Sequence, residues 1–247
     1  GITRGMLEEF GPKRVRNTPI TETAIIGSAI GAAETGLRPC VELMYSDFTM
    51  VAFSEIFHCV SKWRYMHGPE YKLPLVIRSA SGSSNGAGSE HSNTVESLFM
   101  HAPGLTIITP SCAYDAKGLL KSAIRDDDPV VILEHKLLYA HKEEIPEGEY
   151  TIPLGQAKVK REGKDLTIIS WSREVNFALE AAKTLEQEGI DVEVLDLRSL
   201  VPLDWDAIKA SISKTHNAII VSEEVKRGSF AGELSAEISE ELFDELD

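Results

Sequence analysis

The sequence lacks the motifs that identify the commonest nucleotide and zinc enzymes. In its 247 residues there is no Gly-x-x-x-x-Gly-Lys-Ser/Thr loop for a nucleoside triphosphate and no Gly-x-Gly-x-x-Gly turn for a dinucleotide. No His-Glu-x-x-His or Cys-x-x-Cys spacing is present to hold zinc, and no cysteine and histidine have the spacing of a known catalytic pair. The chain therefore belongs to neither of these evident nucleotide-enzyme classes.

Basic residues and cysteines are also scarce. Lys and Arg number 25 against 39 Asp and Glu, a formal charge of −14, which argues against a nucleic-acid or anionic membrane partner. Three scattered cysteines fit a reducing compartment better than a disulfide scaffold. No apolar run approaches the roughly 18 residues of a membrane span, and residues 1–10 do not form a signal peptide. We expect a soluble, cytoplasmic protein.

Short apolar runs alternate with helical periodicity from Thr18 onward, which predicts parallel sheets covered by helices. In the first half we expect strands at 38–43, 73–79, 105–109 and 129–134. The helices there are expected at 22–35, 48–66 with Asp47 as cap, 94–101, and from a Ser111 cap to Arg125.

A polar, turn-rich stretch at 136–153 is interpreted as an interdomain linker. After it we expect a hairpin of 156–160 and 165–171, strands at 190–197 and 218–222, and helices at 175–188, 205–213 and 229–246. The fold class is therefore α/β with two domains, residues 1–144 and 145–247. We expect the second to be truncated, because it ends on a helix where a parallel sheet usually continues.

A Gly/Ser loop at 79–89 leaves a predicted strand and leads to Glu90 and His91. Loops at the carboxyl edge of parallel strands commonly hold ligands, although composition alone favours a flexible connection. Within it, Gly82-Ser83-Ser84-Asn85-Gly86 matches the Gly-x-Ser-x-Gly pattern of hydrolases. We discount that match, because a hydrolase elbow needs a sharp turn directly between strand and helix.

Other residues support both an ordinary and a functional interpretation. The helix macrodipole favours an acidic residue such as Glu22 in the first turn of a helix. An aromatic residue such as Phe48 is commonly part of a hydrophobic core. Gly27 and Gly31 weaken a helix by about 1 kcal/mol each, so a tight contact, within the chain or between subunits, should offset them. The acidic stretch 125–129 fits either a solvated turn or a cation site.

Five motifs in order resemble one family. They are Asn17–Glu22, Gly36–Pro39, Glu90–Ser92, Ala102–Leu105 and Asp115–Asp126. Through them the chain resembles, collinearly over nearly its whole length, the beta subunit of the thiamine-diphosphate-dependent first component of 2-oxo acid dehydrogenase complexes. Residues 134–139 and 150–153 resemble the acetoin dehydrogenase branch.

The resemblance implies a pyrimidine-binding domain followed by a transketolase-type C-terminal domain. It makes Glu22 the carboxylate that hydrogen-bonds the ring nitrogen of the aminopyrimidine, a proton relay that glutamine could not complete. Phe48 matches the aromatic side chain stacked on that ring, and Met44 a neighbouring apolar contact. His91 matches a histidine that orients substrate or the lipoyl acceptor.

The same resemblance implies a structural potassium ion, which some members bind with the residues matching Leu75, Ala123, Ile124, Asp126 and Asp128. Asp128 stands where Asn is more usual, and a backbone-oxygen ligand would tolerate that change. Glu90 replaces the usual Gln before the histidine, which changes the local charge. Val51 stands where some relatives carry Gln, so an extra polar contact to the pyrimidine is in doubt.

The Gly-Asp-Gly motif that holds magnesium and the diphosphate in this family is absent here, because it lies on the alpha subunit. The resemblance thus implies an α2β2 heterotetramer in which neither chain acts alone, and a lipoyl acyltransferase core as partner. Acetoin and pyruvate lead as substrates, with branched-chain 2-oxo acids third. The alternatives are a transketolase-like half-enzyme and a non-catalytic α/β assembly subunit.

Overall fold

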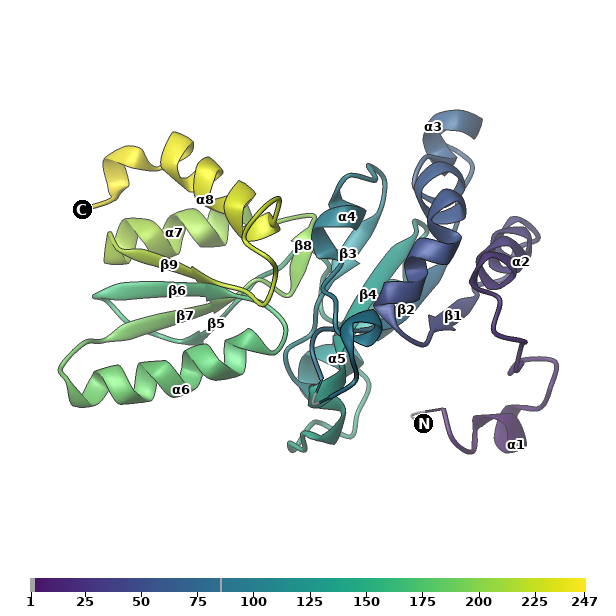
Figure 1. Ribbon diagram of the computed structural model, residues 1–247, viewed down its shortest axis with the longest axis horizontal. Helices are drawn as coiled ribbons and strands as arrows, with labels where there is room; N and C mark the ends of the chain where they lie inside the picture. Colours follow the sequence, from purple (N-terminus) through teal and green to yellow (C-terminus); the bar gives the residue numbers. More distant parts are fainter. Residues whose placement is uncertain (1–2, 85) are drawn as a thin grey trace.

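The computed structural model describes residues 3–84 and 86–247, and places them in two α/β units that lie side by side (Figure 1). The first unit contains a five-stranded sheet in the order β1-β2-β4-β3-β8, and the second a four-stranded sheet in the order β5-β7-β6-β9. The two-domain α/β fold expected from the sequence is confirmed.

Four strands of the first sheet are parallel: β1 (Cys40–Leu43), β2 (Val76–Ser81), β4 (Val130–His135) and β3 (Thr106–Ile108). The strands β2 and β4 are buried along almost their whole length, which explains the continuous apolar run that opens β4. The fifth strand, β8 (Ser199–Val201), comes from the second half of the chain and pairs antiparallel with β3.

The helices of the first unit are α1 (Met6–Phe10), α2 (Glu22–Glu34), α3 (Trp63–His67), α4 (Glu96–Met100) and α5 (Ala113–Arg125). α5 is amphipathic and buries Leu119 and Ala123 against the sheet residues Val130 and Ile132. α1 buries no side chain and lies at the edge of the molecule (Figure 1).

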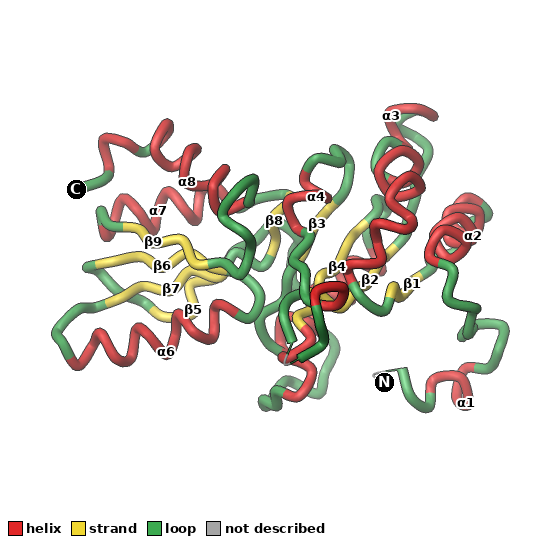
Figure 2. Tube along the Cα trace, viewed as in Figure 1, coloured by secondary structure: helices red, strands yellow, loops and turns green. Residues whose placement is uncertain are grey.

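The second sheet consists of β5 (Lys158–Arg161), β7 (Val192–Asp196), β6 (Leu166–Ser170) and β9 (Ala218–Val221), of which the last three are parallel. Helix α6 (Glu174–Gln187) covers one face, and α7 (Trp205–Thr215) and α8 (Phe230–Glu241) cover the other (Figure 2). Within the described ranges, no helix combines the length and apolar character needed to cross a membrane.

One apolar core joins the two units. Ile107 and Leu133 of the first sheet belong to the same buried cluster as Ile169 and Leu195 of the second, with Leu200 of β8 among them. Burial of this shared core links the units through the hydrophobic effect rather than through a flexible tether. Side chains at the interface are therefore held in fixed relative positions.

The stretch expected to be a linker is packed onto the first unit. It begins with a 3-10 helix, Lys136–Ala140, and later contacts α5, where Ser122 Oγ donates to the Ile152 carbonyl at 2.5 Å. Ile152 is itself buried, and its N–H donates to the Gly118 carbonyl at 3.3 Å. The domain boundary at 144/145 remains a prediction.

The single helix expected at 48–66 is wrong. The chain there forms a 3-10 helix (Ser46–Ala52), a π-helix (Glu55–Val60) and then α3. Side-chain hydroxyl groups donate hydrogen bonds to backbone carbonyls along this stretch. Thr49 Oγ1 donates to the Ser46 carbonyl at 2.5 Å, and Thr23 Oγ1 of α2 donates to the Val51 carbonyl at 3.0 Å. Such competition for carbonyls disfavours a regular α-helix. Asp47 does not act as the N-cap of a helix here.

The expected hairpin of β5 and β6 is also wrong, because β5 pairs antiparallel with β7. Arg161 holds it there: its guanidinium donates to the Val192 carbonyl and forms an ion pair with Asp191 at 3.1 Å. The expected Ser111 cap is replaced by a bond across the interface, since Ser111 Oγ donates to Asp196 Oδ2 at 2.5 Å.

The two glycines of α2, Gly27 and Gly31, make no close contact within the described part of the chain. A Cβ atom built on Gly27 or Gly31 meets nothing within 4 Å. A tight helix contact inside this chain is therefore contradicted, and contact with another subunit stays a prediction.

Candidate active site

Met44, Phe48 and His91, which the resemblance implies for the site, lie in segments that follow the carboxyl ends of β1 and β2, close to the end of β4. Met44 and Tyr45 follow β1, the loop that leads to His91 follows β2, and Lys136 follows β4. In a parallel sheet these ends meet at one edge, where ligands commonly bind because the chain leaves the sheet there in loops.

Three aromatic side chains meet at this edge. The His91 ring lies edge-on to Tyr45, with centroids 4.3 Å apart, and edge-on to Phe48 at 5.3 Å. Lys136 Nζ lies 5.5 Å from the centroid of Tyr45 and donates to the His91 carbonyl at 2.7 Å. The structure thus brings Phe48 and His91, 43 positions apart, into contact.

Asp47 links the two segments that carry these rings. Its Oδ1 accepts from the Asn93 backbone N–H at 3.2 Å and from Asn93 Nδ2 at 2.5 Å. Ser46 Oγ donates to the Asn93 carbonyl at 3.3 Å. A carboxylate acceptor strengthens such bonds, so Asp47 fixes Phe48 relative to His91 instead of capping a helix.

Glu22 lies in the first turn of α2 and is 8 % exposed. In the described part of the chain no ion pair involves it, although burying an unpaired carboxylate is costly. The bond from Thr23 to the Val51 carbonyl holds this turn beside the segment that carries Phe48. A largely buried glutamate without an ion-pair partner, in a turn held beside the segment that carries Phe48, fits an aminopyrimidine, which offers ring nitrogens and a flat face.

The apolar side chains at this edge are open to solvent. Met44 is 42 % exposed and Val51 57 %, and Ile20, just before α2, is 70 % exposed. Adjacent exposed apolar side chains mark an interaction surface. This chain therefore supplies one wall of the site and leaves the opposite wall open.

The five residues assigned to potassium lie around the end of α5. Arg38 Nη1 donates to the carbonyls of Asp126 at 2.6 Å and Ile124 at 3.3 Å. The Leu75 carbonyl accepts from Val130 N–H at 3.0 Å, and that of Ala123 from Asp126 N–H at 3.3 Å. Each carbonyl has a second lone pair, so oxygen ligands for a cation remain while Arg38 holds part of the group.

A second cluster lies where the two units meet. His135, Glu174 and Glu223 offer three ligand atoms within 4.8 Å of one another. The Leu137 N–H donates to His135 Nδ1 at 3.2 Å, so the ring proton is on Nε2, which donates to Glu223 Oε2 at 2.9 Å. A metal-binding histidine has the opposite arrangement, with its second nitrogen as donor. The cluster does not fit a metal ion.

One more glutamate is buried nearby. Glu96, at the start of α4, is 4 % exposed, and its Oε2 has no hydrogen-bond partner in the described part of the chain. Burial, with the charges of Glu224 and Glu223 adding to it, raises the pKa of Glu96 to about 8. Glu96 is therefore protonated at neutral pH.

Replacing Glu96 with glutamine is expected to remove a pH dependence of stability. A carboxyl group whose pKa is raised on folding stabilises the protein below its unfolded pKa, and this contribution is lost as the pH rises from 4.5 through about 8. Relative to Glu96→Gln, the unmodified protein should lose roughly 4 kcal/mol of unfolding free energy between about pH 5 and about pH 9. Urea unfolding at both pH values measures it; equal losses in the two proteins contradict it.

A buried charge network, which the sequence does not predict, also joins the units. Asp115 of α5 pairs with Lys160 of β5 at 2.5 Å and with Arg198 at 2.5 Å. Lys160 Nζ also lies 3.5 Å from Asp196 of β7. The only signal in the sequence is that Asp115 and Asp196 each stand between two apolar residues, and charged residues are usually exposed.

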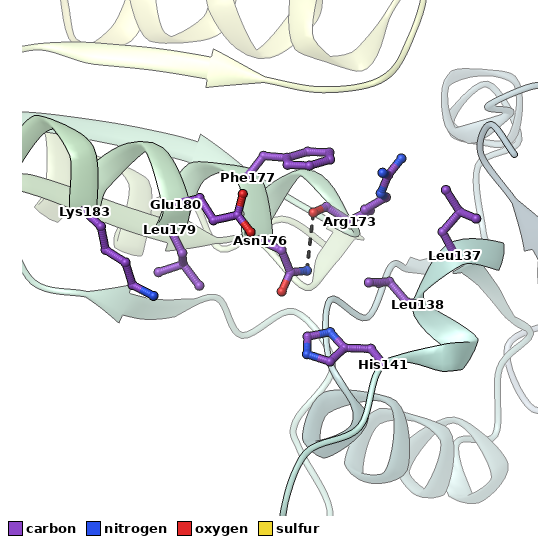
Figure 3. A pocket seen from close by; sticks show the side chains of 9 residues that line it. All are labelled: Leu137, Leu138, His141, Arg173, Asn176, Phe177, Leu179, Glu180 and Lys183. Carbon is purple, nitrogen blue, oxygen red and sulfur yellow. Dashed lines mark hydrogen bonds between the residues drawn. The ribbon is translucent and has the colours of Figure 1, made fainter. Parts of the chain in front are cut away.

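A hollow lies away from the aromatic rings. A pocket of about 360 Å³ opens between the 3-10 helix after β4 and helix α6 (Figure 3). Leu137, Leu138 and Phe177 form its apolar lining, and Arg173 and Lys183 add positive charge. Because Glu22, Phe48 and His91 do not line it, this pocket is separate from the candidate active site.

Two family models match the chain. The transketolase pyrimidine-binding domain matches residues 1–142, and the transketolase C-terminal domain matches residues 155–247. Among solved structures, the chain is similar to one titled "Split gene transketolase, inactive beta4 tetramer". That likeness has a TM-score of 0.82 and 26 % identity, and covers 97 % of this chain and 75 % of the other.

Curated relatives share nearly half of the sequence. A pyruvate dehydrogenase E1 component subunit beta from Porphyra purpurea is 50 % identical over 100 % of this chain and 74 % of its own length. An acetoin:2,6-dichlorophenolindophenol oxidoreductase subunit beta from Bacillus subtilis is 47 % identical, over 100 % and 72 %. A 2-oxoisovalerate dehydrogenase subunit beta from the same species is 45 % identical, over 99 % and 75 %.

The site geometry and these similarities agree with the motifs read in the sequence. The chain belongs to the family of beta subunits of thiamine-diphosphate-dependent 2-oxo acid and acetoin dehydrogenases, built from transketolase-type domains.

Proposed function

We propose that this chain, together with an alpha chain, uses thiamine diphosphate to cleave a carbon–carbon bond next to a carbonyl and to pass the acyl fragment to lipoamide. The observation that carries the proposal is the buried Glu22 carboxylate held beside the segment of Phe48, which in turn contacts His91. Bound thiamine diphosphate would supply carbanion stabilisation.

Three side chains would act on the coenzyme. Glu22 would hydrogen-bond the ring nitrogen of the aminopyrimidine and hold a proton there, while Phe48 would stack on the ring and Met44 contact it. Burial of Glu22 supports the first role, because a hydrogen bond to a carboxylate is stronger out of water. His91 would orient the substrate or the incoming lipoyl group.

The diphosphate and its magnesium ion are proposed to be held by the alpha chain. The exposed apolar edge formed by Met44 and Val51 supports a partner at this site. A heterotetramer of two alpha and two beta chains would complete two such sites, and a lipoyl acyltransferase core would receive the product. A related beta chain is titled an inactive tetramer of beta subunits alone, in agreement with this division.

The substrate is proposed to be acetoin or pyruvate, with branched-chain 2-oxo acids third. The chain is 50 % identical to a pyruvate dehydrogenase subunit and 47 % identical to an acetoin enzyme subunit. These identities differ too little to decide between pyruvate and acetoin as the substrate. Residues 134–139 and 150–153 favour acetoin. A potassium ion is further proposed at the backbone oxygens of Leu75, Ala123, Ile124, Asp126 and Asp128.

The alpha chain should decide both coenzyme binding and turnover. The beta chain alone should show no oxidation of pyruvate or acetoin with an artificial electron acceptor, because it lacks the diphosphate motif. Addition of the alpha chain should give turnover and coenzyme binding that depends on magnesium. Steady-state assays and titration calorimetry of each chain, and of the mixture, measure this.

The controls separate the alternatives. Turnover by the beta chain alone would contradict the division of the site. Transfer between sugar phosphates without lipoamide would identify a split transketolase, and no coenzyme binding by the mixture would support a non-catalytic assembly subunit. Comparison of the three substrate classes in the same assay ranks them.

A further inference from the structure

We propose that Glu223, from the second domain, is a positioning residue for His91 and acts by clamping the loop that precedes it. This inference rests on the proposed function, because it concerns the same site. Glu223 follows β9, whereas the loop after β2 and His91 belong to the first domain. The clamp therefore works across the domain interface.

The Glu223 carboxylate is occupied by donors from the first domain. Oε1 accepts from the Ser83 backbone N–H at 3.0 Å and from Ser83 Oγ, and Oε2 accepts from His135 Nε2 at 2.9 Å. The His135 side chain is 2 % exposed and that of Glu223 is 20 % exposed. Bonds to a carboxylate are the stronger kind of hydrogen bond, and burial protects these from water.

The loop backbone at Gly82 packs closely against the side chains of His135 and Glu223. Gly82 has a φ of +80°, and a Cβ atom there would lie 2.3 Å from the His135 ring and 2.8 Å from Glu223 Oε2. Only glycine allows both this conformation and this approach. The first residues of the loop, Gly82 and Ser83, are thus held against His135 and Glu223 by close packing as well as by hydrogen bonds.

Two connections carry this constraint to His91. The Gly82 N–H donates to the Asn93 carbonyl at 3.2 Å. Gly82, which packs against Glu223, thus holds Asn93 at the end of the loop, and Asp47 binds the same residue. On the other side, Lys136 follows His135 directly and donates to the His91 carbonyl at 2.7 Å. The His91 carbonyl and the Asn93 carbonyl, two residues further along, are therefore tied to segments that Glu223 contacts.

The charge of the clamp is stable over the working pH range. Burial works to raise the pKa of Glu223, but the hydrogen bonds from His135 and Ser83 hold it at about 2. Burial raises the pKa of the neighbouring Glu174, and the charge of Glu223 adds to that effect. Glu174 and Glu96, which face Glu223, are thereby discouraged from ionising beside it.

Glutamine at position 223 cannot satisfy both donors. One side of its amide can accept from Ser83, but the other side presents N–H groups to the N–H of His135. In the assembled enzyme, Glu223→Gln should lower kcat/KM by about 10-fold to 100-fold, as is typical when support for a functional side chain is removed. Glu240→Gln, at an exposed position on α8, is the matched control and should leave kcat/KM unchanged.

A double-mutant cycle with His91→Ala tests whether Glu223 acts through His91. If it does, Glu223→Gln should cause no further loss once His91 is absent, because interacting residues are not additive. An equal loss in both backgrounds, or no loss in the unmodified background, overturns the proposal. Should Glu223→Gln fail to fold, Ser83→Ala removes the hydroxyl hydrogen bond to Glu223 Oε1 and enters the same cycle.

Hydrogen exchange gives a readout that does not need turnover. In the alpha–beta complex, Glu223→Gln should accelerate exchange of the amides at 82–83 and 88–93, with no change in β1. If the complex has neither dehydrogenase activity nor coenzyme binding, the proposed function fails, yet faster exchange would still demonstrate the clamp. Unchanged exchange in the loop overturns the clamp itself, whatever the activity.

Discussion

Replacing Glu22 with glutamine in the assembled enzyme is expected to lower turnover by about 10²-fold to 10⁴-fold, the range of a lost acid–base group. Glutamine has the same shape and can still hydrogen-bond the coenzyme, but it cannot hold a proton on a ring nitrogen. Because Glu22 is buried and close to the Phe48 segment, water cannot replace it easily. Steady-state rates with the unmodified alpha chain measure the effect.

The control uses the other end of the same helix. Glu34→Gln, at the exposed last position of α2, changes the same functional group and should leave turnover within twofold of the unmodified enzyme, since surface changes of this kind are nearly neutral. Both variants should form the complex on size exclusion. Near-normal turnover of Glu22→Gln would remove Glu22 from the proton relay.

Replacing Asp115 with alanine is expected to cost about 3–5 kcal/mol of unfolding free energy, because it removes the ion-pair partner of the buried Arg198 and leaves Lys160 with Asp196 alone. Asp115 is fully buried, and its two partners, Lys160 and Arg198, have side chains only 17 % and 7 % exposed. Although burial works to raise the pKa of Asp115, the hydrogen bond from Lys160 keeps it below the ordinary value. The group is ionised in the folded protein at neutral pH.

Urea unfolding at neutral pH measures this loss. Glu149→Ala, which breaks the solvent-exposed ion pair with Arg125, is the matched control and should hardly move the unfolding midpoint, because water and salt screen exposed pairs. A loss below about 1 kcal/mol for Asp115→Ala would show that the network is solvated like a surface pair. Asp115→Ala would then change only the packing at the interface between the two units.

The periodicity of the sequence predicted the sheets well because their strands are buried. The central strand β4 begins with four consecutive apolar residues, and the apolar residues of an amphipathic helix such as α5 repeat every 3.6 residues. The irregular helix after β1 was not predictable in this way. Its departure from an α-helix follows from Thr23 of another helix, which binds the Val51 carbonyl.

The motifs located part of the candidate site. They identified Glu22, Phe48 and His91 from local order along the chain, and the structure joins Phe48 to His91. Glu223 could not be found this way, because its partner Ser83 is 140 positions away. A glutamate after a short apolar strand resembles any surface residue until the fold brings it to the interface.

By itself, the sequence determined the α/β class, the parallel strands and the family, since each depends on local periodicity or on residues close together in the chain. Only the tertiary structure decided that β8 joins the sheet of the first domain, that Ser111 binds Asp196 instead of capping its helix, and that Glu223 holds the loop before His91. Each of these is a hydrogen bond between residues more than 80 positions apart. Chain folding, not local preference, determines which such donors and acceptors meet.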